Sequence, residues 1–187
     1  MSIPLQLVHS AHLTLRPILK SDLTDLMQVN GDSEVTRFLP YPTWESEKDA
    51  QAWWVRMEER MSTGTAKQFV IHHPEDGKVI GSVLLFNYDE GSSRLEIGYV
   101  LARSYWRRGY AREALNALLR QLMGESGIRR VEAEVNPENT ASNALLASLG
   151  FSLEGCRRER WLAESGPYSV NVYGLLASEL PAFADTP

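Results

Sequence analysis

The sequence predicts a mixed α/β layer with helices on both faces of a sheet, and two observations support this. Stretches in which apolar and polar residues alternate, the period of a half-buried strand, are interleaved with stretches that carry the apolar stripe of an amphipathic helix. The predicted order is β-α-α-β-β-β-α-β-α-β-β. The 187 residues contain no repeat or interior linker, so we expect one domain spanning 1–187, with only the tail 181–187 peripheral.

The alternation is clearest in RLEIGYVL, residues 94–101. Its odd-numbered residues share one face and its even-numbered residues, Glu96 among them, share the other. The other expected strands have the same β-rich composition and end at turn residues such as Pro17 and the sequence PEDG. The full set of expected strands is 12–17, 67–73, 78–88, 94–101, 129–135, 151–162 and 168–176.

Four segments have helical periodicity and plausible ends. Ser21 and Ser46 are expected N-caps of the first two helices, and Gly150 is the expected C-cap of the last. Between the first two helices, the segment 34–44 is expected to be irregular because Pro40 and Pro42 interrupt it. The expected helices are 21–30, 46–62, 110–122 and 140–150.

Composition excludes several classes of protein. A net charge of −5 argues against general nucleic-acid binding, which requires a basic excess. The single cysteine, Cys156, cannot form an internal disulfide or a zinc cluster, and the four histidines show no metal-ligand spacing. No secretory signal or membrane-length apolar stretch is present, so a soluble cytoplasmic protein without a metal is expected.

The stretch YWRRGYAREAL, residues 105–115, places a glycine directly before a helix. The first N–H groups of a helix lack partners within it, and the helix dipole attracts anions to them. Arginines 103, 107, 108 and 112 add positive charge, so a pyrophosphate would suit this turn. The alternative, an ordinary helix start with solvated arginines, stays open on this stretch alone.

Two further stretches, LEIGYVL and VNPENTASNALLASLGF, occur in order with YWRRGYAREAL. Together these motifs resemble the GNAT acyltransferase superfamily, and most closely its ribosomal-protein N-terminal acetyltransferase (Rim-like) branch. The resemblance runs from HLTLRPI to VYGLLASEL, nearly the whole chain. It implies the GNAT fold, a mixed, mostly antiparallel sheet with one splayed parallel pair of strands, here 94–101 and 129–135.

The resemblance also implies acetyl-CoA as co-substrate, held between the splayed strands. Its pantetheine would pair with the backbone of Tyr99, Val100 and Leu101. Asn139 and Ser142 match positions that contact the coenzyme arm or its thiol. The pyrophosphate would bind the turn amides of Arg107, Arg108, Gly109, Tyr110, Ala111 and Arg112.

Amide formation from a thioester requires a deprotonated amine, a donor to the carbonyl oxygen, and a way to accommodate the thiolate. Glu96 is the expected general base, through a water, and the N–H of Val100 the expected oxyanion donor. A solvated Glu96, or one paired with Arg94, is the alternative. Many relatives place a tyrosine where this chain has Leu146, so Ser142 is the expected donor to the thiolate, unless its hydroxyl only bonds helix amides.

The acceptor is expected to be a protein N-terminus, because an α-amine titrates near about 8 and a lysine near about 10.4. A small amine such as a polyamine or aminoglycoside is an alternative, and a non-catalytic acyl-CoA sensor is another. Phe38, Tyr41, Trp44 and Asn136 are the expected acceptor-side residues. The sequence does not decide between monomer and homodimer.

Overall fold

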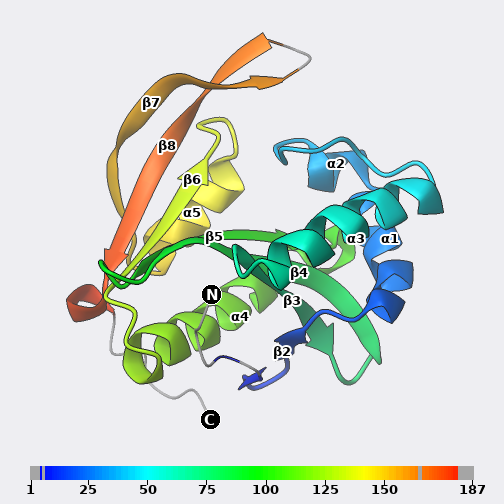
Figure 1. The fold of residues 1–187 in the computed structure, drawn as a ribbon, viewed down its shortest axis with the longest axis horizontal. Coiled ribbons are helices and arrows are strands. Elements are labelled where there is room, and N and C mark those ends of the chain that lie inside the picture. The colour runs from blue at the N-terminus through cyan, green and yellow to red at the C-terminus, as the bar shows by residue number, and fades with distance from the viewer. Residues whose placement is uncertain (1–4, 6, 164–165, 181–187) are drawn as a thin grey trace.

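The computed structural model describes residues 5, 7–163 and 166–180, and the expected peripheral tail 181–187 lies outside them. The helices are α1 (Leu23–Asn30), α2 (Ser33–Thr36), α3 (Glu47–Ser62), α4 (Tyr110–Arg120) and α5 (Thr140–Ser148). The strands are β1 (Val8–His9), β2 (Thr14–Pro17), β3 (Ala66–His73), β4 (Lys78–Asp89), β5 (Arg94–Leu101), β6 (Arg130–Val135), β7 (Ser152–Ala163) and β8 (Gly166–Leu176). Figure 1 shows their arrangement.

The strands form one sheet in the order β1-β2-β3-β4-β5-β6-β8-β7. Among the described strands, β5 and β6 are the one parallel pair, and every other neighbouring pair is antiparallel. The strand β8 lies between β6 and β7, and the hairpin of β7 and β8 extends past the end of β6 (Figure 1). The predicted mixed, mostly antiparallel sheet is therefore confirmed.

Helices cover both faces, as predicted, because each strand of the central sheet buries apolar residues on two sides. One core forms where α4 and α5 pack on the sheet, around Leu95, Ile97 and Leu115. The other forms where α1 and α3 pack on the opposite face, around Val70, Trp53 and neighbouring residues. The even and odd residues of β5 thus enter two different cores, and functional groups on β5 can face either one.

The local ends of the helices match the sequence only in part. Ser46 is the N-cap of α3 and forms a capping box with Asp49, as expected. Gly150 follows α5 in a left-handed conformation with φ 92°, the usual end of a helix. Ser21, in contrast, lies inside a 3₁₀ turn (Lys20–Asp22) and caps no helix, because the carboxylate of Asp22 instead accepts the Leu19 N–H at 2.7 Å.

Two short elements were not predicted. The strand β1 has only two residues, and α2 is a single turn within the segment expected to be irregular. The side chain of Asp32 begins α2 by accepting the N–H of Glu34 at 3.0 Å. Periodicity cannot detect elements this short, because they do not complete one repeat of their pattern.

Candidate active site

The parallel pair β5 and β6 parts after three residue pairs, the last of which is Glu96 with Glu132. Along its other edge, β5 stays paired with β4 as far as Gly81 and Leu101. The rest of β5, residues 97–101, therefore has a partner strand on one edge only. This confirms the expected splay.

The antiparallel register shows which backbone groups of β5 face the gap. The N–H of Ala102 donates to Ile80 at 2.8 Å, which makes this a hydrogen-bonded pair of the β4–β5 ladder. Such pairs alternate with non-bonded ones. By this alternation Val100 bonds Ser82 on β4, while the backbone N–H and C=O groups of Tyr99 and Leu101 point toward β6.

Val100 is therefore not the oxyanion donor that the sequence suggested. A Cβ placed on Gly81 would lie 2.3 Å from the carbonyl oxygen of Val100, so this carbonyl is directed at β4. The N–H of the same residue points to the same side of the strand. The N–H groups that face the gap belong to Tyr99 and Leu101. The alternation along the sequence shows which face of the strand each side chain occupies. It does not show which residues of β5 form the hydrogen-bonded pairs with β4.

The turn before α4 presents unpaired backbone donors, as expected for an anion site. The first bond of the helix runs from the Glu113 N–H to the Gly109 carbonyl at 2.9 Å, so the N–H groups of Tyr110, Ala111 and Arg112 precede it. Gly109 has φ 83°, and a Cβ there would meet no atom within 4 Å. Arg107 is also left-handed, with φ 60°. Such turns direct successive N–H groups into one concavity.

The four arginines of this region do not all face solvent freely. Arg103 pairs with Asp32 at 2.7 Å, and the guanidinium of Arg108 lies over the rings of Tyr105 and Tyr110 at 5.5 and 5.1 Å. Arg107 and Arg112 are exposed. Of the four, only the charge of Arg103 is compensated by a described carboxylate, so the positive charge available to an anion at the turn is that of Arg107, Arg108 and Arg112.

Trp106 links this turn to the open edge of β5. Its indole Nε1 donates to the Leu101 carbonyl at 2.7 Å, which satisfies one of the carbonyls that face the gap. The sequence analysis assigned Trp106 no role. Trp106 is five residues after Leu101, and this spacing alone does not reveal the contact. The 3₁₀ turn η2 (Arg103–Tyr105), which lies between the two residues, must also be known.

Glu96 is half-buried and faces away from α4 and α5, at the last pair before the strands part. Burial raises its pKa, the amide of Asn87 partly offsets this, and the nearby carboxylates of Glu134 and Glu132 raise it further. Arg94 does not neutralise it, because Arg94 pairs with Glu132 at 3.1 Å and with Asp89 at 3.5 Å.

Asn87 is a site residue that the sequence analysis missed. Its Nδ2 donates to Glu96 Oε2 at 2.9 Å. Asn87 has φ 51° and lies where the register of β4 and β5 shifts between Phe86 and Asp89. Asparagine tolerates this left-handed conformation better than most residues, so an asparagine at a strand end was the available signal.

Ser142 lies in the first turn of α5, and its hydroxyl does not bond the helix amides. Its Oγ is 2.7 Å from the phenol oxygen of Tyr99, across the gap between β5 and α5. Burial raises the pKa of Tyr99 to about 12. Leu146, where many relatives carry a tyrosine, is completely buried in the core.

The asparagines before α5 hold the helix start together. Asn139 is the N-cap, and its Oδ1 accepts the Ser142 N–H at 3.1 Å. Asn136 Oδ1 accepts the Glu138 N–H at 2.9 Å, so this oxygen is engaged within the turn. Asn143 donates to both of their carbonyls and accepts from Asn171 and Tyr173, each at 2.8 Å.

The three aromatic residues expected at an acceptor rim occupy different environments. Trp44 is wrong as a rim residue, because it is only 4% exposed and packs on Trp53 with ring centroids 5.5 Å apart. Tyr41 is half-buried and donates to Asn30 Oδ1 at 2.9 Å. Phe38 is half-buried beside Arg37. Proline interruptions correctly suggested a loop but could not show that Trp44 turns inward.

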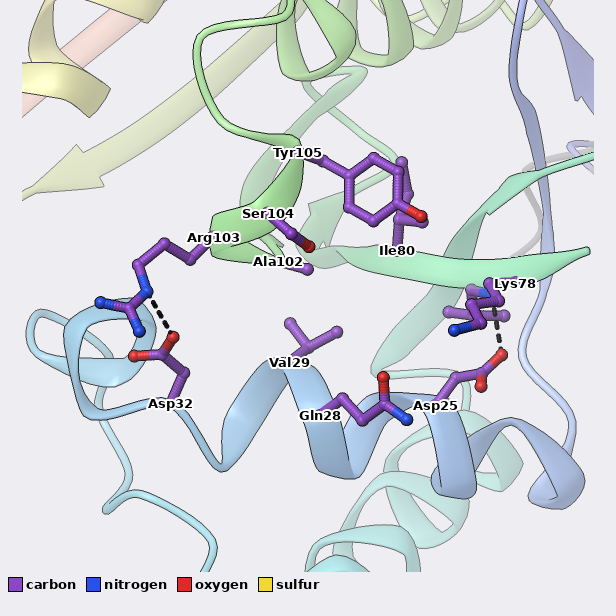
Figure 2. A pocket seen from close by; sticks show the side chains of 11 residues that line it. Asp25, Gln28, Val29, Asp32, Lys78, Ile80, Ala102, Arg103, Ser104 and Tyr105 are labelled. Carbon is purple, nitrogen blue, oxygen red and sulfur yellow. Dashed lines mark hydrogen bonds and ion pairs between the residues drawn. The ribbon is translucent and has the colours of Figure 1, made fainter. Parts of the chain in front are cut away.

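A hollow of about 400 Å³ lies between α1 and the residues that follow β5 (Figure 2). Three of its charged side chains are already engaged: Asp32 pairs with Arg103 at 2.7 Å, and Asp25 accepts the Val79 N–H at 2.8 Å. A fourth, Lys78, is exposed. Of the residues that the sequence analysis connected with the site, Arg103 is the one that lines this hollow. It touches η2, which lies between β5 and the turn before α4.

Within residues 5, 7–163 and 166–180, no group of three or more histidine, cysteine or acidic side chains could hold a metal ion. Over the same part of the chain, no helix is long and apolar enough to cross a membrane.

Comparison with known proteins shows the family. Residues 12–152 match the model of the acetyltransferase (GNAT) domain. The chain belongs to this GNAT family. It is 32% identical over 175 residues to an uncharacterized N-acetyltransferase, p20, of Bacillus licheniformis, which covers 94% of this chain and 98% of the relative. A [ribosomal protein uS5]-alanine N-acetyltransferase of Escherichia coli is 31% identical over 102 residues, 54% of this chain and 53% of the relative.

Solved GNAT structures share the fold. A ribosomal-protein α-N-acetyltransferase in complex with coenzyme A superposes with a TM-score of 0.81 at 23% identity, covering 91% of this chain and 98% of the other. A spermidine N-acetyltransferase of Vibrio cholerae, in complex with CoA and spermine, gives a TM-score of 0.78 at 20% identity, covering 90% and 98%.

As a GNAT enzyme, this protein is an acetyl-CoA-dependent acyltransferase. The residues present fit that co-substrate. The open backbone edge at Tyr99 and Leu101 can pair with amide groups of a pantetheine arm, and the amides that follow Gly109 can bind a diphosphate.

Proposed function

We propose that the protein transfers the acetyl group of acetyl-CoA to a protein N-terminal α-amine by direct attack. The observation that carries the proposal is Glu96, a half-buried carboxylate with a raised pKa beside the point where the strands part. Acetyl-CoA supplies the activated acyl group as a thioester. The amine must reach it deprotonated, and Glu96 is the group positioned to accept that proton.

The strength of the base favours an α-amine. A carboxylate whose pKa is raised above its ordinary value is a better base than a solvated one, yet remains far weaker than a lysine amine. An α-amine, which titrates near about 8, loses its proton to such a base far more readily than a lysine, near about 10.4. The alanine N-acetyltransferase of E. coli, named for a ribosomal protein, supports the same acceptor class.

Two residues are proposed to bind the reacting carbonyl. The N–H groups of Tyr99 and Leu101 face the gap, and either can donate to the oxygen on which negative charge develops. Phe38, Tyr41 and Asn136 remain the proposed acceptor-side contacts, and Asn139 and Ser142 the proposed contacts to the coenzyme arm or its thiol. The turn residues 107–112 are proposed to hold the diphosphate.

A small polyamine is the second candidate, and one feature favours it. Glu96, Glu132 and Glu134 share one face of β5 and β6, and acidic groups attract a polycation. Two of the three are already paired, Glu132 with Arg94 and Arg130, and Glu134 with Arg157. This neutralisation makes the polyamine the weaker candidate.

The test is an acceptor panel in which release of free CoA is measured and the acetylated atom is located by mass spectrometry. The panel contains peptides with free N-terminal alanine or serine, the same peptides blocked at the α-amine but carrying lysine, and spermidine. We expect the free N-terminal peptides to show the highest kcat/KM, and the blocked peptides little turnover. A higher kcat/KM for spermidine would transfer the assignment to small amines.

A further inference from the structure

Two hydroxyl groups from distant parts of the chain meet beside the parted strands. Tyr99 comes from β5 and Ser142 from the first turn of α5, and their oxygens are 2.7 Å apart. Both side chains are partly buried. The contact joins the open edge of β5 directly to the helix that carries the proposed thiolate donor.

The direction of this hydrogen bond follows from the acidity of the two groups. A phenol, with a pKa of about 10, is a far stronger acid than an aliphatic alcohol and is the better donor. Burial raises the pKa of Tyr99 to about 12, so its phenol keeps its proton throughout the physiological range. Tyr99 therefore donates and Ser142 Oγ accepts, which leaves the single hydroxyl proton of Ser142 free to point elsewhere.

The surroundings leave Ser142 few other partners. Its backbone N–H is engaged by Asn139 Oδ1 at 3.1 Å, and the helix start is fixed by the contacts of Asn143. Leu146, one turn further along α5, is completely buried and offers no hydroxyl. Within the described residues, Tyr99 is the one side chain that the structure shows bonded to Ser142 Oγ.

We infer that Tyr99 is a positioning residue of the acetyl transfer: its phenol orients the Ser142 hydroxyl so that Ser142 donates a hydrogen bond to the departing CoA thiolate. This inference rests on the proposed function and deepens it. It assigns the Tyr99 side chain a role separate from that of its backbone.

The step balances without proton transfer from either hydroxyl. The amine nitrogen forms a bond to the acetyl carbon, the carbon–sulfur bond breaks, and its electron pair stays on sulfur. The proton lost by the amine goes to Glu96. Ser142 shares its proton with the thiolate but keeps it, because a thiol titrates near about 8.5 and is a stronger acid than either hydroxyl.

The first experiment needs no acetyl acceptor. The pKa of the CoA thiol is measured in complex with the protein from the ultraviolet absorbance of the thiolate. A hydrogen bond to a charged group should lower it by about one to two units relative to free CoA. Ser142→Ala should remove this shift, and Tyr99→Phe should remove most of it, while CoA still binds. An unshifted thiol in the wild-type complex would overturn the inference.

The second experiment is a double-mutant cycle on kcat with the preferred acceptor. Ser142→Ala should lower kcat about tenfold, and Tyr99→Phe about three- to tenfold, each with the KM for acetyl-CoA changed less than about twofold. Because Tyr99 acts through Ser142, the double variant should be no slower than Ser142→Ala alone. Additive losses would show that Tyr99 has an independent role and would overturn the inference.

Tyr173→Phe is the matched control. It also removes a tyrosine hydroxyl that bonds α5, at 2.8 Å to Asn143, but it leaves Ser142 untouched. We expect kcat and the thiol pKa to stay near wild type. Equal losses in this variant would mean that any disturbance of α5 has the same effect. If the thiol pKa shifts as expected while no amine is acetylated, the proposed function fails and the hydroxyl pair stands.

Discussion

The two edges of β5 differ although they belong to the same eight residues. Toward β4 the pairing continues from Glu96 to Leu101, and toward β6 it stops at Glu96. Beyond that point β6 continues with β8, which pairs with it from Leu176 to Asn171 (Figure 1). One edge of β5 is thus a closed ladder, and the other presents backbone groups with no strand to receive them.

This difference leaves backbone groups of an ordinary strand available to bind another molecule. An unpaired strand edge is unfavourable when it is buried, so it persists where another molecule or a side chain satisfies it. Here Trp106 satisfies the carbonyl of Leu101, and the remaining groups of Tyr99 and Leu101 are proposed for the co-substrate. Glu96 lies at the last residue pair before β5 and β6 part. A desolvated carboxylate is therefore beside the unpaired edge of β5.

Removal of the Glu96 carboxylate, at the point where β5 and β6 part, should have the largest effect on activity. Glu96→Gln is expected to lower kcat about 100- to 1000-fold, because general bases contribute about 10²–10⁴. Its raised pKa means that wild-type activity is lost as pH falls through a value higher than that of an ordinary glutamate. The variant should lose this limb of the pH–rate profile. A retained limb would remove Glu96 from the mechanism.

The substitution Glu96→Gln, which lowers activity, should not lower the stability of the fold. A carboxyl whose folded pKa is raised binds more protons in the folded state, so its ionisation destabilises the fold as pH rises from its unfolded pKa to its folded pKa. Glu96→Gln should therefore keep or raise Tm at neutral pH. The control is Glu154→Gln: Arg130 lowers the pKa of Glu154, so that variant should lose stability at neutral pH and keep its activity.

The phosphate turn can be tested by a pair of glycines with the same backbone strain. Gly109→Ala and Gly127→Ala both place a side chain at positive φ, 83° and 70°, and in both cases the Cβ meets no atom within 4 Å. Each should lose about 1 kcal/mol of stability. Only Gly109→Ala should raise the KM for acetyl-CoA, about tenfold, because only it redirects the turn amides. Equal KM values in steady-state assays would contradict the anion site.

The exposed charge of Arg112 should contribute less to acetyl-CoA binding than the backbone amides of the turn. Arg112→Gln is expected to raise the KM for acetyl-CoA about three- to tenfold, and this ratio should shrink with added salt because an exposed charge is screened. Arg158→Gln removes the same charge from an exposed position on β7 and serves as the control. If both variants respond alike, the effect comes from net charge and not from the turn.

The smallest effect is expected from Trp106→Phe. It leaves the Leu101 carbonyl without its indole donor and should lower Tm by about 2–4 °C while raising the KM for acetyl-CoA about two- to threefold. Trp161→Phe removes a comparable indole bond, 3.0 Å to Glu134, from the β7–β8 hairpin. A rise in the acetyl-CoA KM in the control but not in Trp106→Phe would refute the proposed role of Trp106.

The sequence by itself determined the fold class, nearly every long element, the glycine turn before α4 that is proposed to bind an anion, and the candidate base Glu96. These depend on periodicity, on glycine placement and on motif spacing, all of which are local. The sequence also fixed that Glu96 and Tyr99 lie on opposite faces of β5, because side chains alternate along a strand.

The tertiary structure alone decided which groups meet. The phase of the β4–β5 ladder, set by pairing across the sheet, moved the gap-facing N–H from Val100 to Tyr99 and Leu101. Packing against Trp53 drew Trp44 into the core. The Tyr99–Ser142 contact joins residues 43 positions apart. No local pattern encodes such pairings, because they arise only when separate elements fold against one another.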